Sequence, residues 1–355
     1  MMDLSIPYYE DKTRISNSNI GWFLNKGPAY LHKMLTEDVP EEKSQALERG
    51  TMIHEYLLQP EEFQKDYVVW DKGRPTSAQQ EKFCQALASS IEIEPNRAIL
   101  SAYKEAYSTK GKTEENMLSE GLKIASTLKD YIDFLKENTG RIMISPYEYQ
   151  MLKKIKNEIR AHKLAWNLLW PLEGGPQGPF VLTDDGPKEI IKAYHEFHIN
   201  WEWHWLKEHV SCKSLLDGLT IDFQSKTVII YDLKTTQKLW HFEESMEMYD
   251  YERQLSYYTM AVKWYLEHEC GIDGEDIAYN WKFSHYIIGI DTTGSYEIRV
   301  FKIELKTYES KKLKFVSTTA KIAEALFDIA WHQKNNKWDH SRAYYEGDGS
   351  ETLNL

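Results

Sequence analysis

The sequence has few cysteines, and none of them belongs to a recognisable metal or redox motif. Only three occur among the 355 residues, and they are widely separated: Cys84, Cys212 and Cys270. This spacing excludes the paired thiols of a zinc site and the four thiolates of an iron–sulfur cluster. Because disulfide frameworks are also excluded, a reducing cytoplasm is the expected setting.

Long apolar segments are missing as well. No stretch approaches the roughly 18 apolar residues that a membrane-spanning helix needs. The first residues, MMDLSIPYYEDKTR, lack the basic and then apolar pattern of a signal peptide. We therefore expect neither a membrane partner nor export.

The sequence also lacks an excess of positive charge. The chain carries 43 basic and 55 acidic residues, which gives a formal net charge of −12. A protein that simply coats nucleic acid would be basic, so this class is disfavoured. The charge does not exclude an enzyme whose acids gather at a metal while basic residues line a groove.

The apolar pattern that is present predicts an α/β protein, with a mixed central sheet flanked by helices and a helical N-terminal region. We place the N-terminal region at 1–140, the core at 141–335 and a flexible tail at 336–355, within one integrated domain. Strands are predicted at 67–70, 141–145, 194–205, 210–222, 227–235, 280–291 and 296–305. Helices are predicted at 15–35 with a Gly-Pro break, 41–58 up to Pro60, 78–139 with breaks, 147–170, 243–268 and 307–334, and a loop or hairpin at 171–187.

In the stretch IIYDLKTT, residues 229–236, an apolar strand is followed directly by two opposite charges. Asp232 and Lys234 share one face of this strand, and the unbroken apolar run indicates that the strand is central in the sheet. Burying both charges costs desolvation energy, so either a salt bridge or a metal-dependent active site has to repay it. If Asp217 lies on the neighbouring strand, two carboxylates meet there, as Mg²⁺ or Mn²⁺ requires. Lys234 can then stabilise charge on a phosphate, or help to orient and deprotonate a water.

Each of three further patterns can be interpreted either structurally or functionally. The strand at 194–205 alternates aromatic residues with a polar face, which either meets solvent or contributes to a site; the polar residues are Glu196, His198, Asn200, Glu202 and His204. Gln254 and Tyr258 share a helix face, where they bond each other or contact the substrate. A mid-helix Gly50 costs about 1 kcal/mol and indicates close packing, and His54 one turn later is either structural or a ligand.

Together these pieces resemble the PD-(D/E)XK nuclease superfamily, and more narrowly its RecE-type, exonuclease VIII-like phage members. The matched motifs occur in the family's order: G-x-x-x-H at 50–54, the acid Glu196 with Trp201, the aspartate Asp217, D-L-K-T-T at 232–236, and Q-x-x-x-Y at 254–258. The resemblance covers roughly residues 15–65 and 140–335, and no motif is matched in 75–140. Glu202 shares a face with Glu196 and is an alternative third acid.

The resemblance implies a Mg²⁺-dependent DNA exonuclease, with Mn²⁺ as a substitute, that degrades one strand from duplex ends in the 5′ to 3′ direction. It implies the metal ligands His54, Glu196, Asp217, Asp232 and Leu233, and the catalytic residues Lys234, Asp232, Asp217, Gln254 and Tyr258. It also implies double-stranded DNA ends as substrate, a single-strand annealing protein as partner, and a ring-like homo-oligomer. Phage-type recombination in the host cytoplasm would be the setting.

The predicted DNA contacts lie in two places. Arg74 precedes a helix whose start carries Ser77, and a helix N-terminus beside an arginine suits a backbone phosphate as well as it suits an ordinary capped loop. Arg253 precedes the Gln254 motif. Two other functions stay open: a structure-specific endonuclease with the same chemistry, and a binding protein on an inactive nuclease fold. The intact Asp217, Asp232 and Lys234 argue against the inactive fold.

Overall fold

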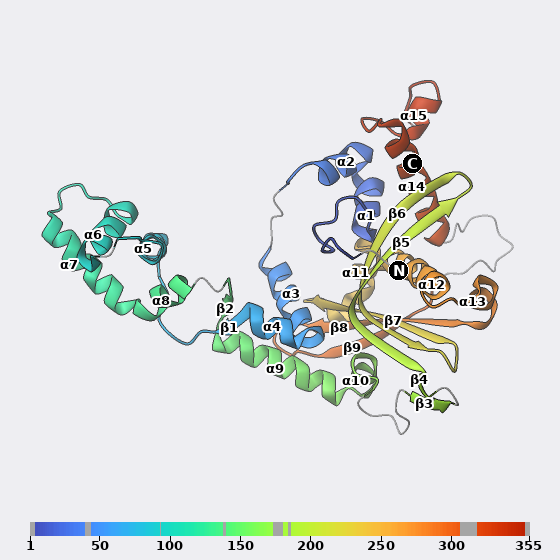
Figure 1. Ribbon diagram of the computed structural model, residues 1–355, viewed down its shortest axis with the longest axis horizontal. Helices are drawn as coiled ribbons and strands as arrows, with labels where there is room; N and C mark the ends of the chain where they lie inside the picture. The colour runs from blue at the N-terminus through green and yellow to red at the C-terminus, as the bar shows by residue number, and fades with distance from the viewer. Residues whose placement is uncertain are drawn as a thin grey trace. The chain divides into compact units, whose positions relative to one another are not determined.

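The computed structural model describes residues 4–39, 44–92, 94–137, 140–172, 180–183, 186–305 and 318–351 (Figure 1). Contacts divide the chain into two compact units, Met1–Gln59 with Lys154–Leu355, and Pro60–Lys153. The division therefore does not fall at the predicted position 140. Helices from the first 59 residues pack on the core, because α1 (Asn17–Lys26) contacts α12 and α14, and α3 (Gln45–Leu58) contacts β7.

The larger unit contains the predicted mixed sheet. Its strands are β5 (Ile191–Trp205), β6 (Glu208–Asp222), β7 (Thr227–Thr236), β8 (Lys282–Asp291) and β9 (Ile298–Ile303), hydrogen-bonded in that order. β7 and β8 run parallel, whereas the other neighbours are antiparallel. β7 is the third of the five strands, so the central place predicted from its apolar run is confirmed. The α/β class with a mixed sheet is confirmed with it.

Helices cover this sheet and share its core. α12 (Tyr251–His268) contacts β5, β6 and β7, and α14 (Thr318–Asn335) contacts β6 and α12. The predicted break between two N-terminal helices is confirmed at Gly27, where α1 ends with φ of 83° and α2 (Pro28–Thr36) begins. The larger unit also contains η1 (Leu239–His241), α13 (Gly274–Asn280) and a hairpin of β3 (Phe180–Thr183) and β4 (Gly186–Glu189).

Several predicted elements are divided or end differently. The helix predicted at 243–268 is two helices, α11 (Phe242–Met248) and α12, because Asp250 adopts φ of 51° between them. The helix predicted at 147–170 is interrupted at His162, between α9 (Pro146–Ala161) and α10 (Lys163–Leu169). Part of the helix predicted at 307–334 lies outside the described residues, and α14 covers the rest. The predicted flexible tail contains α15 (Arg342–Glu346), capped by the Ser341 hydroxyl.

The smaller unit, Pro60–Lys153, is mainly helical, as predicted. It contains α4 (Pro60–Asp66), α5 (Ala78–Ala88), α6 (Pro95–Ala106), α7 (Glu114–Thr127) and α8 (Lys129–Glu137), with a parallel pair of β1 (Tyr67–Val69) and β2 (Ile142–Ile144). Pro60 follows the end of α3 and opens α4, since proline is tolerated at a first helical position. Phe83, Cys84 and Tyr103 lie in its own core. Among the described residues, no helix has the length and apolarity needed to cross a membrane.

Gly218 on β6 is required by close packing with the central strand. It pairs directly with Tyr231 of β7, and a Cβ at this position would lie 1.8 Å from the Tyr231 ring. We expect Gly218→Ala to lower the free energy of unfolding by about 3 kcal/mol, measured by urea denaturation. Gly274→Ala is the control, because its Cβ would meet only the flexible end of Glu267 at 3.1 Å. Equal stability of the two variants would refute this account of the packing.

Candidate metal centre

Three potential metal ligands from distant parts of the sequence meet at one point of the larger unit. They are His54 on α3, Glu196 on β5 and Asp217 on β6, and one ligand atom of each lies within 4.8 Å of the others. His54 Nδ1 lies 3.6 Å from Asp217 Oδ2. All three side chains are partly buried, so they are shielded from bulk water yet still reachable.

The strand register explains why the two acids meet. β5 and β6 pair His195 with Gly218 and Phe197 with Leu216, so Glu196 and Asp217 face each other between these pairs. Glu196 has φ of 46°, which is uncommon for a residue other than glycine and is found mainly where the surrounding structure enforces it. The backbone at Glu196 is therefore held in a costly conformation next to the proposed ligands.

The central strand brings the other predicted residues beside this cluster. The main-chain N–H of Leu233 donates to Asp217 Oδ2 at 2.7 Å. Asp232 is 1% exposed, and its Oδ2 lies 2.6 Å from Lys234 Nζ. The salt bridge that the sequence allowed is thus present, but it adjoins an acidic cluster instead of standing alone at a strand end.

Gln254 links Asp232 to Tyr258 from the neighbouring helix α12. Its amide Nε2 donates to Asp232 Oδ1 and to the Tyr258 hydroxyl, both at 2.9 Å. The interpretation of Gln254 and Tyr258 as a mutually bonded pair is therefore confirmed. The pair also orients a carboxylate of the candidate site, so the structural contact and a role at the site coexist.

Helix α3 approaches β7 closely, as the mid-helix glycine indicated. A Cβ on Gly50 would lie 3.2 Å from Thr235 Oγ1, so a larger residue would push the helix away from the strand. His54 follows about one helical turn later on the same side of α3. The close packing predicted from Gly50 is confirmed, and it positions His54 over the acids.

Burial and mutual repulsion change the protonation of the acids. Burial, followed by the charges of Asp217, Asp232 and Glu55, raises the pKa of Glu196 from 4.5 to about 8. Burial and Asp217 raise the pKa of Asp232 to about 6, although Lys234 opposes the change. Burial alone would lower the pKa of Lys234, but Asp232 and Asp217 raise it, so this lysine stays charged at neutral pH. A charged ammonium group suits stabilisation of negative charge better than proton abstraction.

These residues fit a divalent cation that prefers oxygen ligands. Carboxylates are the ligands that Mg²⁺ and Mn²⁺ prefer, and His54, Glu196 and Asp217 are close enough together that they would hold such an ion after small adjustments of their side chains. Burial, and then repulsion between the acids, raises the pKa values of Glu196 and Asp232, and a bound cation would supply the compensating charge that favours their ionised forms. The predicted ligands His54, Glu196 and Asp217 are therefore assembled, with Asp232 and Leu233 adjoining them.

The raised pKa of Glu196 gives a prediction for the protein without metal. Between pH 4.5 and about 8 the folded protein holds a proton on Glu196 that the unfolded chain has lost. Stability should therefore decrease as pH rises through this interval and level off above it. We expect the melting temperature in chelator to decline from pH 5 to pH 8, and Glu196→Gln to reduce this decline. The same slope in both proteins would contradict the assignment.

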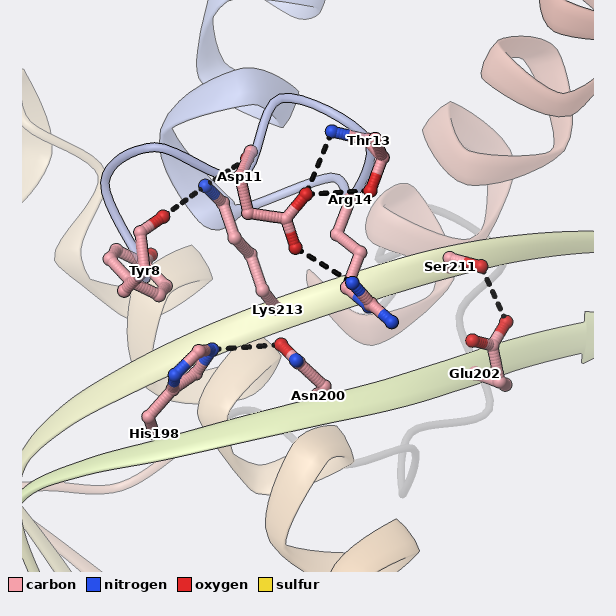
Figure 2. Close-up of polar contacts among 9 residues, drawn as sticks. All are labelled: Tyr8, Asp11, Thr13, Arg14, His198, Asn200, Glu202, Ser211 and Lys213. Carbon is pink, nitrogen blue, oxygen red and sulfur yellow. Dashed lines mark hydrogen bonds and ion pairs between the residues drawn. The ribbon is translucent and has the colours of Figure 1, made fainter. Parts of the chain in front are cut away.

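The N-terminal segment covers part of the polar face that β5 and β6 share beyond Glu196, and Tyr8 packs edge-on against His198 with 5.3 Å between ring centres (Figure 2). Lys213 on β6 donates from Nζ to the main-chain oxygens of Tyr8 and Asp11. On β5, His198 bonds Asn200 at 2.8 Å, and Glu202 accepts from Ser211 at 3.0 Å. Most of this face therefore meets protein instead of solvent. Glu202 is bound elsewhere, so Glu196 is the acid that reaches the cluster.

The predicted DNA-binding residues have different surroundings. Arg253 is 7% exposed; it bonds Asp250 at 2.9 Å and the main-chain oxygen of Asn17. A structural role therefore suits Arg253 better than the DNA contact predicted for it. In the smaller unit Arg74 is exposed, and the Ser77 hydroxyl caps α5 by accepting from the Gln80 N–H. Contact of Arg74 and Ser77 with DNA stays a prediction.

Two nearby residues were not singled out from the sequence. Glu55 directly follows His54 and adds a negative charge that raises the pKa of Glu196. Tyr251 lies under the catalytic candidate Lys234, with 4.8 Å between Nζ and the ring centre. In the sequence, only its position next to His54 could have indicated Glu55. The contact of Tyr251 with Lys234 depends on how α12 packs against β7, which the sequence does not show.

Comparison with known proteins gives only remote structural likenesses. No family model and no curated protein matches the chain. The crystal structure of a candidate exonuclease from Eubacterium rectale aligns with 100% of this chain and 96% of its own, at 11% identity and a TM-score of 0.44. The structure of the protein SSO0001 aligns with 72% of this chain and 87% of its own, at 11% identity and a TM-score of 0.25. These values are too low to indicate an activity for this chain.

Proposed function

We propose that this protein is a metal-dependent deoxyribonuclease, and that it acts as an exonuclease on duplex ends. The observation that carries the proposal is the meeting of His54, Glu196 and Asp217 beside the Asp232–Lys234 pair. A site that only stabilised the fold would not need repelling acids, a strained Glu196 and a charged lysine at one strand end.

Each residue has a role in phosphodiester hydrolysis. His54, Glu196, Asp217 and Asp232 would hold one or two Mg²⁺ ions. When bound, such an ion polarises the phosphate and makes a water more acidic. Lys234, anchored by Asp232, presents its ammonium group to the negative charge that develops on the phosphate. Gln254 and Tyr258 keep the Asp232 carboxylate in position through the bond at 2.9 Å.

The test is incubation of purified protein with a linear duplex or a covalently closed circular duplex, in Mg²⁺ or in chelator. Degradation of the linear duplex alone, abolished by chelator, is the expected result. Cutting of the closed circle would favour the structure-specific endonuclease. No cleavage of either substrate at saturating Mg²⁺ or Mn²⁺ would favour a binding protein on an inactive nuclease fold.

The direction of DNA degradation, the partner protein and the oligomeric state are proposed from the family resemblance alone. We propose 5′ to 3′ degradation in phage-type recombination, in the cytoplasm, with a single-strand annealing protein that loads on the exposed strand. We also propose a ring-like homo-oligomer around DNA. Sedimentation that shows only a monomer, with and without DNA, would contradict the ring.

A further inference from the structure

A column of stacked aromatic rings runs from the sheet to the surface of the larger unit. Phe301 of β9 stacks on Phe242, with ring centres 4.7 Å apart and planes at 6°. Phe242 stacks on Tyr251 at 5.9 Å and 23°, and Tyr251 stacks on Tyr249 at 5.6 Å and 22°. Phe242 is buried, whereas Tyr249 is 59% exposed. The outer end of a nearly parallel stack is therefore presented to solvent.

The column adjoins the candidate active site through its third ring. Lys234 Nζ lies 4.8 Å from the centre of the Tyr251 ring and 2.6 Å from Asp232. The Tyr249 ring centre lies 5.6 Å beyond that of Tyr251, so it is at most about 10.4 Å from the same nitrogen. One strand of a duplex advances about 3.4 Å per nucleotide, so this limit spans about three paired nucleotides and fewer extended, unpaired ones. Tyr249 can therefore reach a base close to the phosphate at Lys234.

A tight turn after α11 holds Tyr249. Asp250, between the two tyrosines, has φ of 51°, a left-handed conformation that commonly ends a helix and that aspartate adopts more readily than most residues. Arg253 keeps Asp250 in place through a bond of 2.9 Å to its carboxylate, and Arg253 is itself bound to Asn17. The turn sets the Tyr249 ring nearly parallel to Tyr251 and fixes it there.

The charges around Tyr249 select which part of a nucleic acid fits. Helix α11, which leads to Tyr249, has the exposed acids Glu243, Glu244 and Glu247, of which only Glu244 has an ion-pair partner within the described residues, Lys238 at 3.5 Å. The charges of Glu243 and Glu247 therefore repel backbone phosphates. An uncharged base has no such penalty. Its flat face matches the exposed ring at the end of the column, and stacking on tyrosine is tolerant of sequence.

We propose that Tyr249 stacks against an unpaired nucleobase of the substrate strand near the cleavage point. This inference rests on the proposed nuclease function and specifies a subsite of it. Inside a duplex both faces of each base are covered by its neighbours. The last pair of a blunt end exposes one face but stays held by its partner base, whereas a frayed end or an overhang offers a base that can turn onto the ring. The subsite therefore selects DNA ends with an unpaired nucleotide over fully paired, blunt ends.

The experiment compares the affinity of the full-length protein for a blunt duplex and for the same duplex with a short unpaired overhang, in Ca²⁺, by fluorescence anisotropy. Tyr249→Ala should weaken binding of the overhang duplex by about fivefold to a hundredfold and change binding of the blunt duplex by less than about twofold. Tyr249→Phe keeps the ring and should retain the affinity. Tyr279→Ala, at a tyrosine on α13 that is 84% exposed, is the matched control.

A fluorescent purine analogue at the unpaired position gives a second readout that a purely structural role would not change. Its emission should be quenched by the wild-type protein and by Tyr249→Phe, and not by Tyr249→Ala. If the wild-type protein binds both duplexes and Tyr249→Ala changes neither affinity nor quenching, the base subsite is refuted while the nuclease proposal stands. If the wild-type protein binds neither duplex, the proposed function fails and the subsite fails with it.

Discussion

Lys234→Ala is expected to lose cleavage while keeping its affinity for the metal. The ammonium group of Lys234 is no metal ligand, and it lies 2.6 Å from Asp232, where it competes with a cation for that carboxylate. Metal affinity should therefore persist or rise when the lysine is removed. Single-turnover cleavage should fall by about a hundredfold or more, because the transition state loses a charge partner worth roughly 3 kcal/mol.

A control variant at a second lysine distinguishes the loss of Lys234 from the loss of an ordinary ion pair. Lys226, directly before the first residue of β7, pairs with Asp276 at 2.6 Å, and nearly the whole strand separates it from Asp232 and Lys234. Lys226→Ala should cleave at nearly the normal rate. Calorimetric metal titration and cleavage are measured for both variants. A Lys234→Ala protein as active as Lys226→Ala would leave the salt bridge as the whole role of Lys234.

Asp217→Asn is expected to lose both metal affinity and cleavage. The substitution preserves the shape of the side chain and its ability to accept from the Leu233 N–H, which lies 2.7 Å away. It removes the negative charge that faces His54 and Glu196, so the cation loses a charged ligand. We expect metal affinity to fall by at least roughly tenfold to a hundredfold, and cleavage to fall with it at any subsaturating metal concentration.

Glu202→Gln is the control for Asp217→Asn. Glu202 is also an acid on a strand of the same hairpin, but it bonds Ser211 at 3.0 Å away from the cluster. Its replacement should leave metal affinity and cleavage nearly unchanged. If Glu202→Gln impaired both while Asp217→Asn impaired neither, the choice of Glu196 and Asp217 as the acids would be wrong.

Much of the fold and the centre of the site could be predicted because they depend on local patterns. The apolar run before Asp232 indicated a central strand, and the alternation along 194–205 indicated β5, since burial on one or both faces fixes such patterns. Gly50 indicated close helix packing. The ordered motifs then grouped Asp217, Asp232 and Lys234 before their register was known.

What escaped prediction depends on contacts between distant segments. Part of the polar face of β5 is covered by Tyr8, which packs against His198 about 190 positions later in the chain, and no periodicity in either segment shows this. Asp250 gave no sign that it would adopt φ of 51° and divide a helix. The unit boundaries at Gln59 and Lys154 likewise arise from packing between segments and not from composition.

The position of Mn²⁺ in a crystal of the wild-type protein, located by its anomalous scattering, tests most directly whether this cluster binds a metal. We expect a peak bounded by His54, Glu196 and Asp217, beside Asp232, and its disappearance in Asp217→Asn. A structure at saturating Mn²⁺ with no peak at these residues, or with an ordered ion only elsewhere, would contradict the central claim that this cluster is a metal centre.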